Sequence, residues 1–180
     1  ASTSFLEGAW SGIRQPGMID FEHSPETGVE KSTFLRLAEK VTELPEEMNF
    51  FPKIRKLYAE RRAMVLEKQM LDWGAGETMA FATLLEEYRP VRISGQDSGR
   101  GTFAHRHAIV TTEEDSKYVP LNHLSDKQAP FSVYNSLLSE YGVLGFEFGY
   151  AYATPRSLTI WEAQFGDFGN GAQIIFDQFI

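Results

Sequence analysis

A single carboxylate followed by an aromatic loop is the pattern in this sequence that best suits chemistry. Glu140 opens an apolar stretch with helical spacing. A later loop carries Gln164, Phe165, Asp167 and Phe168. Aromatic faces stack on heteroaromatic rings, and an amide side chain can both donate to and accept from the edge of an aminopyrimidine. A partly buried carboxyl group can stay protonated and donate a hydrogen bond. The layout therefore favours a flat, aromatic-lined pocket for a heteroaromatic cofactor ring.

The same residues also fit a plainer interpretation. Glu140 follows Ser139, a residue type that caps helices, so it also fits a first-turn carboxylate that complements the helix dipole. Phe165 and Phe168 equally fit a hydrophobic core. The residues alone leave both interpretations open.

Glycines at positions 142, 145 and 149 form a stripe on one face of the helix expected after Ser139. Each glycine costs a helix interior about 1 kcal/mol relative to alanine. Close approach of another element would offset that cost. The stripe is compatible with tight packing inside one core and with an interface between subunits.

The glycine-rich loop 94–102 resembles a phosphate-binding loop only superficially. It lacks the Gly-Lys-Ser/Thr of the nucleotide loop and the glycine spacing of dinucleotide-binding folds. The sequence favours a tight loop that positions Gln96 and Asp97.

His105 and His107 have a His-x-His spacing, which would place both rings on one face of a strand. A metal site is an alternative, but the chain has no cysteine and only His23 and His123 as further imidazoles. We expect a hydrogen-bonded structural or substrate-facing role for the pair, and no metal site.

The elements that must position these residues follow an alternating pattern of helices and strands. Such alternation predicts an α/β fold with a mainly parallel sheet flanked by helices. Ligands of such sheets bind beyond the carboxyl ends of the strands, where loops 94–102 and 162–168 begin. The expected helices are 34–44 after an N-cap at Ser32, one opening at Pro52, one from Asp72 to Pro90, 140–152 and a last one from about 169; the expected strands are 91–93, 108–112, 118–121 and 157–161.

Composition limits the function classes. The net charge is −8, which argues against a general nucleic-acid surface. The absence of cysteine excludes disulfides and thiolate chemistry and fits a reducing compartment. No apolar run reaches the roughly 18–20 residues that span a bilayer. We therefore expect no membrane and no nucleic-acid partner. The chain stops at Ile180 inside a helical pattern, so we expect a piece of a longer protein.

Four segments together resemble a known family: DWGAGE at 72–77, VRISGQDSGRGTFAHRHA at 91–108, YVPLNH at 118–123, and residues 136–180. The chain is similar to the thiamine diphosphate-dependent decarboxylating component of the 2-oxoglutarate dehydrogenase complex. The resemblance implies a truncated, transketolase-like pyrimidine-binding domain. Residues 1–70 would be a connecting segment with two helices, and residues 71–180 the N-terminal half of that domain.

The resemblance also implies roles for individual residues. Glu140 would be the catalytic carboxyl, which hydrogen-bonds the pyrimidine ring of thiamine diphosphate and promotes its imino tautomer. Phe168 would stack on that ring, and Gln164 and Gln96 would line the same pocket. The magnesium ion and the diphosphate would be held by a domain outside this chain, so the chain alone is expected to be inactive.

The implied parent enzyme decarboxylates 2-oxoglutarate and passes the succinyl group to a lipoyl-bearing succinyltransferase component. It would be a homodimer in the cytoplasm, or in the mitochondrial matrix of a eukaryote. Two alternatives stay open: a relative that acts on 2-oxoadipate, and a non-catalytic α/β interaction module.

Overall fold

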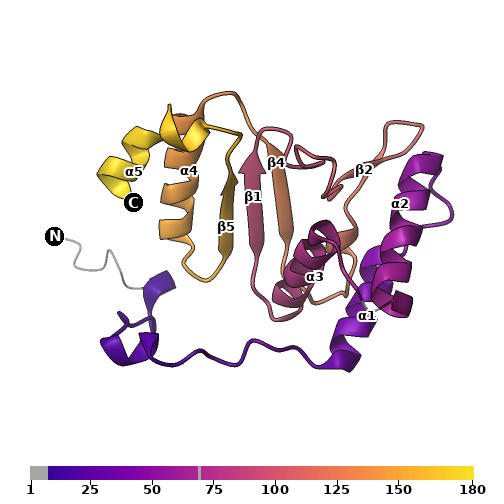
Figure 1. Cartoon of the computed structure of the whole chain (residues 1–180), viewed down its shortest axis with the longest axis horizontal. Coiled ribbons are helices and arrows are strands. Elements are labelled where there is room, and N and C mark those ends of the chain that lie inside the picture. The colour runs from indigo at the N-terminus through magenta and orange to yellow at the C-terminus, as the bar shows by residue number, and fades with distance from the viewer. Residues whose placement is uncertain (1–7, 69) are drawn as a thin grey trace.

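The computed structural model describes residues 8–68 and 70–180, and its centre is a three-stranded parallel sheet (Figure 1). The strands are β1 (Val91–Gly95), β4 (Phe131–Asn135) and β5 (Leu158–Glu162), in the order β4-β1-β5. All three run in the same direction, with Val91 opposite Phe131 and Leu158. Their carboxyl ends therefore meet at one edge of the sheet.

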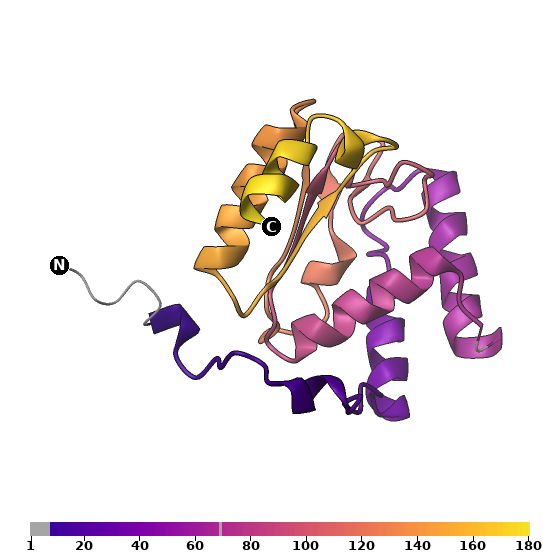
Figure 2. The same cartoon turned by 60° about the vertical axis from the view of Figure 1, so that its left-hand side comes forward.

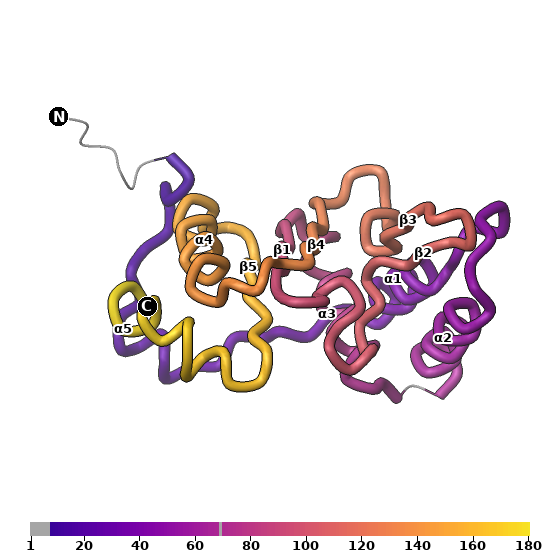
Figure 3. The backbone as a smooth tube through the Cα atoms, turned by 90° about the horizontal axis from the view of Figure 1, so that it is seen from above, coloured from indigo at the N-terminus to yellow at the C-terminus, as the bar shows by residue number. Residues whose placement is uncertain are grey.

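Alternating residues of β1 show which helices cover each face of the sheet. Val91 and Ile93 are buried in a core shared with α3 (Trp73–Glu86). Arg92 lies between them and points to the opposite face, where it pairs with Glu147 of α4 (Glu140–Ala153). Figure 3 shows the sheet from above, between α4 and α5 (Gln173–Phe179) on one side and α3 on the other.

The helical segments between residues 31 and 68 pack in two hydrophobic clusters, one shared with the sheet and one formed around Phe50, Tyr58 and Val110. The structure has α1 (Lys31–Thr42) and α2 (Pro52–Ala63) there, followed by a π-helical turn, η3 (Met64–Lys68). The core combines buried side chains of α1, η3, α3, β1, the segment 121–129 and β4. Its members include Leu37, Ala38, Val41, Val65, Met79, Phe81, Ala82, Leu85, Val91, Ile93, Leu121, Leu124 and Phe131.

The sequence-based prediction of strands 108–112 and 118–121 is wrong in length and in sheet. Only β2 (Val110–Thr111) and β3 (Lys117–Tyr118) form, and they pair antiparallel, apart from the parallel sheet. The Ala108 amide instead donates to the Gly99 carbonyl at 2.8 Å. Pro120 starts a 3-10 turn, η4 (Pro120–Asn122), because proline has no N–H to continue a ladder.

Strand β4 was not predicted. The segment Phe131–Asn135 has the aromatic and β-branched residues typical of strands, but it is short and follows Pro130. Its pairing partner β1 is about forty positions earlier in the chain, so the local sequence alone does not predict this strand.

Helix termini agree with prediction where a local signal sets them. Asp72 caps α3, as predicted, and its Oδ1 accepts from the Ala75 amide at 2.7 Å. Helix α4 begins at Glu140, as predicted. The prediction for Ser32 is wrong, because Glu30 takes the N-cap position of α1. The last helix starts at Gln173 because η5 (Asp167–Gly169) is a separate 3-10 turn.

The irregular stretch before α1 runs along the end of the sheet opposite to the carboxyl edge (Figures 1 and 2). It contains two 3-10 turns, η1 (Gly8–Trp10) and η2 (Met18–Phe21), and its first seven residues lie outside the described part. Trp10 Nε1 donates to the Tyr152 carbonyl at 2.7 Å, and Arg156 donates to the Ser11 carbonyl at 2.6 Å. The stretch is therefore attached to the end of α4. Within residues 8–68 and 70–180, no helix combines the length and apolar character needed to cross a bilayer.

Candidate functional site

The predicted site residues gather at the carboxyl edge of the parallel sheet. Loop 96–109 follows β1, α4 begins shortly after β4, and loop 163–172 follows β5. Figure 1 shows the start of α4 and the loop after β5 at this same edge. The chain thus places three segments, distant in sequence, around one region where α/β sheets bind ligands.

Glu140 is the first residue of α4 and is half-buried. A Cβ atom at Gly171 would lie 2.0 Å from Glu140 Oε2, so only glycine leaves room for the carboxylate. Among the described residues, no hydrogen-bond or ion-pair partner of the Glu140 carboxylate is found. Ser139 takes the N-cap position, but its hydroxyl makes no capping bond. The carboxylate is thus held against a glycine, with its hydrogen-bonding capacity free.

Gln164 connects the loops after β1 and β5. Its Nε2 donates to Thr102 Oγ1 at 2.6 Å and to the Gln96 carbonyl at 3.0 Å. Its backbone amide donates to Asp167 Oδ2 at 2.9 Å, which closes the turn. The structure therefore brings the Gln164 side chain and the Gln96 backbone together. Both side-chain amide hydrogens of Gln164 are used inside the protein, and within residues 8–68 and 70–180 its Oε1 has no hydrogen-bond partner.

The two phenylalanines of the loop after β5 lie on the surface. Phe165 is fully exposed, at 104%, and Phe168 in η5 is 57% exposed. The alternative that both are core residues is therefore wrong. Phe168 precedes Gly171, the residue that lies against Glu140, by three positions.

A buried guanidinium organises the loop after β1, and sequence reasoning did not identify it. Arg106 is 3% exposed. Its Nε and Nη2 donate to the two carboxylate oxygens of Glu77 at 2.6 and 2.9 Å. Its Nη1 donates to the Ser98 carbonyl at 2.8 Å and also to Glu162 Oε2. Burial lowers the pKa of Arg106, but the hydrogen bonds to Glu77 and Glu162 raise it by more, so the group stays charged.

Helix α2 supports the same loop from outside. Arg61 Nη1 donates to the Arg106 carbonyl at 2.8 Å, and Nη2 donates to the His105 carbonyl. The Tyr58 hydroxyl donates to the His107 carbonyl at 2.8 Å. Burial raises the pKa of Tyr58 to about 12. Three consecutive carbonyl groups of the loop are thereby satisfied by the segment before residue 70.

The two histidines of the His-x-His motif do not lie on a strand. Residues 105–107 have irregular backbone, and His107 has a positive φ of 49°. The shared face that a strand would give is therefore absent at this motif. His105 Nε2 lies 4.0 Å from Glu162 Oε1, whereas burial and then the charges of Arg61, Lys53 and Arg100 lower the pKa of His107. No group of three His, Cys, Asp or Glu side chains suited to a metal ion occurs within the described ranges.

One glycine of the stripe on α4 faces another element of the part of the chain that the structure describes. A Cβ at Gly145 would lie 3.4 Å from Ile175 Cδ1 of α5. At Gly142 it would meet the Ser139 side chain, and at Gly149 it would meet nothing within 4 Å. A separation of 3.4 Å is an ordinary van der Waals contact, so packing within the described chain does not require glycine at Gly145 or Gly149, and at Gly142 the neighbour is the cap residue of the same helix.

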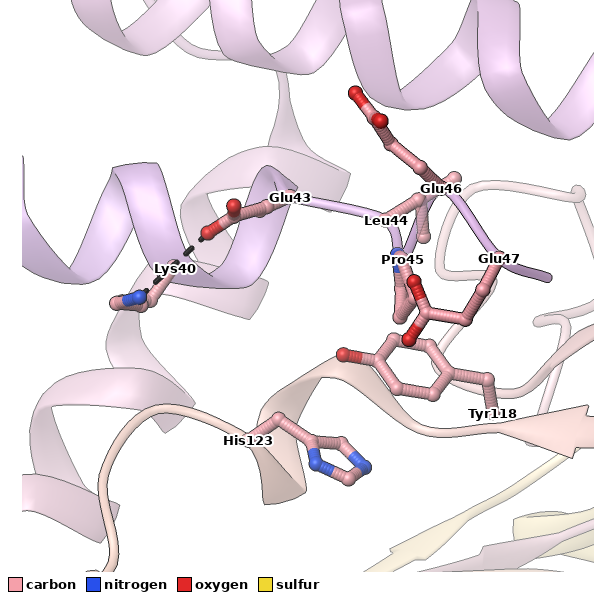
Figure 4. Close-up of a pocket in the computed structure, with 8 residues that line it drawn as sticks. All are labelled: Lys40, Glu43, Leu44, Pro45, Glu46, Glu47, Tyr118 and His123. Carbon is pink, nitrogen blue, oxygen red and sulfur yellow. Dashed lines mark ion pairs between the residues drawn. The ribbon is translucent and has the colours of Figure 1, made fainter.

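A separate hollow of about 420 Å³ lies at the end of α1, away from the predicted site residues (Figure 4). The Tyr118 and His123 rings stack there with centroids 4.5 Å apart. Its other lining residues are mostly charged, and Lys40 pairs with Glu43 at 3.6 Å. Burial, with the charges of Glu43 and Glu47, raises the pKa of Tyr118. The lining consists of Lys40, Glu43, Leu44, Pro45, Glu46, Glu47, Tyr118 and His123.

The fold agrees with the family that the sequence matches. Residues 69–180 match the family described as transketolase, pyrimidine binding domain. This match covers more than half of the chain, and the chain belongs to this family. The predicted family resemblance and the predicted α/β fold are therefore confirmed.

Curated relatives carry a more specific name. The chain is 54% identical over 156 residues to the 2-oxoglutarate dehydrogenase E1 component of Haemophilus influenzae, a match covering 86% of the chain and 17% of that protein. It is 49% identical over 180 residues to the protein of the same name from Rickettsia felis, covering 98% of the chain and 18% of the relative. For the Cupriavidus necator protein of this name the identity is 51% over 160 residues, covering 86% and 17%. The chain therefore spans less than a fifth of the length of these relatives.

Proposed function

We propose that the chain is the part of a 2-oxoglutarate dehydrogenase E1 component that binds the aminopyrimidine ring of thiamine diphosphate. In this proposal the whole protein decarboxylates 2-oxoglutarate and transfers the succinyl group to a lipoyl acceptor. The observation that carries it is the Glu140 carboxylate, which lies against Gly171 with no partner among the described residues. The names of the curated relatives support the same choice.

The residues at the carboxyl edge suit such a ring. Glu140 offers an uncommitted carboxyl group for a ring nitrogen, and Phe168 offers an exposed aromatic face for stacking. The Gln164 Nε2 group bonds to Thr102 and to the Gln96 backbone carbonyl. Among the described residues, Gln164 Oε1 and the half-buried side chain of Gln96 have no hydrogen-bond partner, so both can line the pocket. When bound, the cofactor supplies the carbanion stabilisation that 2-oxo acid decarboxylation requires. Magnesium would be held by another domain of the whole protein.

Glu140 would act by holding a proton at the ring nitrogen. Because the carboxyl group has no competing hydrogen bond within the described chain, its whole hydrogen-bonding capacity is available to the ring. Its position at the start of α4 places the carboxyl group beside Gly171 of the loop after β5. The chain thus contributes orientation and control of one proton, and the cofactor contributes the electron sink.

The proposed partners follow from the same assignment. The whole enzyme would be a homodimer and would deliver its product to a lipoyl-bearing succinyltransferase component. Gly142 and Gly149 support the dimer, because they contact no other element of the described chain and leave a small-residue surface on α4. The bacterial relatives favour the cytoplasm as the compartment.

The test is Glu140→Ala in the intact enzyme, assayed by 2-oxoglutarate-dependent ferricyanide reduction. We expect the rate to fall by about 10²–10⁴-fold, the usual contribution of a positioned acid–base group. Glu60→Ala is the matched control, since Glu60 forms an exposed ion pair with Lys56 on α2. An unchanged rate for Glu140→Ala would refute the assignment and favour a non-catalytic module. Competition between 2-oxoglutarate and 2-oxoadipate on the unaltered enzyme decides the substrate.

A further inference from the structure

The loop after β1 contains backbone strain at three residues that are not glycine. Asp97, Ala104 and His107 have φ values of 57°, 52° and 49°. The left-handed conformation costs a residue with a Cβ about 1–2 kcal/mol. Such strain persists only where the surrounding contacts hold the backbone in place, and it concentrates at functional sites.

Arg106 supplies contacts that hold this loop. It lies between Ala104 and His107, and its guanidinium reaches three separate elements. It forms a two-bond fork with Glu77 of α3, bonds to the Ser98 carbonyl within the loop, and bonds to Glu162, the last residue of β5. A planar guanidinium with five donors can satisfy this set, whereas a lysine ammonium cannot reproduce the fork.

We propose that Arg106 is a positioning residue that sets the distance between the two loops of the candidate cofactor pocket. Ser98 is two residues after Gln96, and Glu162 is two residues before Gln164. By binding Ser98 and Glu162 together, Arg106 holds the loops at the separation at which Gln164 Nε2 meets the Gln96 carbonyl at 3.0 Å. This inference rests on the proposed function, because it assigns Arg106 to the same pocket.

A second buried ion pair makes it possible to separate positioning from stability. Arg92 of β1 forms a two-bond fork with Glu147 of α4 at 2.7 and 2.8 Å, and the two side chains are 15% and 4% exposed. The pair has the same two-bond fork as Arg106 with Glu77, with an arginine that is somewhat more exposed and a glutamate that is more buried. It connects β1 with α4, and within the described residues it makes no hydrogen bond or ion pair to either loop of the pocket.

The experiment compares Arg106→Lys with Arg92→Lys in the intact enzyme. Three quantities are measured: the dissociation constant of thiamine diphosphate from quenching of protein fluorescence, the melting temperature, and hydrogen–deuterium exchange of residues 94–108 in cofactor-free enzyme. We expect Arg106→Lys to weaken cofactor binding about tenfold or more and to speed exchange in this loop. Arg92→Lys should lower the melting temperature but leave the dissociation constant within about twofold of wild type.

Two results would overturn the inference. One is wild-type cofactor affinity in Arg106→Lys. The other is equal weakening in Arg92→Lys at the same loss of melting temperature, which would make the effect one of general stability. If Arg106→Lys does not fold, Glu162→Gln replaces it, since glutamine keeps an acceptor for Arg106 and should weaken binding in the same direction by less.

Failure of the proposed function gives a different result. The unaltered enzyme would then not bind thiamine diphosphate, or Glu140→Ala would keep full activity, and the inference about Arg106 would be refuted with it. A wild-type enzyme that binds the cofactor and depends on Glu140, combined with normal affinity in Arg106→Lys, refutes the inference alone.

Discussion

Replacing Gly171 by alanine should disable the candidate site without unfolding the protein. The added methyl carbon would lie 2.0 Å from Glu140 Oε2 and 3.5 Å from Glu140 Cβ. Ordinary contacts begin at 3.4 Å, so the carboxylate must move by about 1.4 Å while the rest of the side chain stays in place. Because the displaced atom is the end of a flexible side chain, the fold loses little, and the smaller entropy of the unfolded alanine chain partly offsets the loss.

A displacement of this size is enough to abolish most of the proposed activity. Misplacement of a catalytic group by about 1 Å can cost on the order of 10²-fold in rate, which corresponds to about 2.7 kcal/mol. We therefore expect Gly171→Ala in the intact enzyme to reduce 2-oxoglutarate-dependent ferricyanide reduction about 100-fold, with a melting temperature within a few degrees of wild type. Gly169→Ala is the control, since a Cβ at Gly169 meets nothing within 4 Å. Wild-type activity in Gly171→Ala would refute the reasoning that the Glu140 carboxylate must lie against this glycine.

Three further predictions concern stability, measured by urea unfolding of the 180-residue chain. Tyr58→Phe should lower the free energy of unfolding by about 1–2 kcal/mol at neutral pH, because it removes the hydrogen bond to the His107 carbonyl. Since the Tyr58 pKa is raised from 10.0 to about 12, the unfolding free energy of wild type should fall by about 2.7 kcal/mol as the pH rises through this interval. The variant should lack this contribution to the pH dependence. Because the pKa of His107 is lowered in the folded chain, the free energy of unfolding should be highest above about pH 6.5 and should decrease as the pH falls below that value. His107→Asn, a substitution that tolerates the positive φ at this position, should make this decrease smaller. Glu147→Ala leaves the partly buried Arg92 guanidinium without its carboxylate partner and should cost about 3 kcal/mol, against less than about 0.5 kcal/mol for the exposed Glu60→Ala; equal losses would contradict the burial argument.

Local signals predicted the parts of the fold that local chemistry decides. Asp72 caps its helix because an aspartate oxygen satisfies a free backbone amide, and Pro52 starts a helix because its missing N–H is not needed there. The start of α4 at Glu140 was predicted on the same grounds. These features need only a few neighbouring residues, so the sequence contains all the information that they require.

Features that depend on distant partners were missed. Strand β4 forms because its backbone hydrogen-bonds to β1, and the residues Phe131–Asn135 alone do not indicate this pairing. Arg106 bonds to Glu77 and Glu162, which are 29 and 56 positions away in the sequence. The His-x-His motif around Arg106 drew attention to the histidines instead. Gly171 is required because of a carboxylate from another helix, so its role was not visible in its own segment.

The family match begins at residue 69, but the physical unit begins earlier, at α1. Leu37 and Ala38 are fully buried in the core that holds the central strand, and Tyr58 and Arg61 satisfy carbonyl groups of the loop after β1. Chimeric enzymes that exchange this region between relatives should therefore join the parents before Lys31, in the irregular stretch that precedes α1. A junction at the edge of the sequence match would separate the loop from the side chains that hold it, even though every residue of the recognised domain were transferred intact.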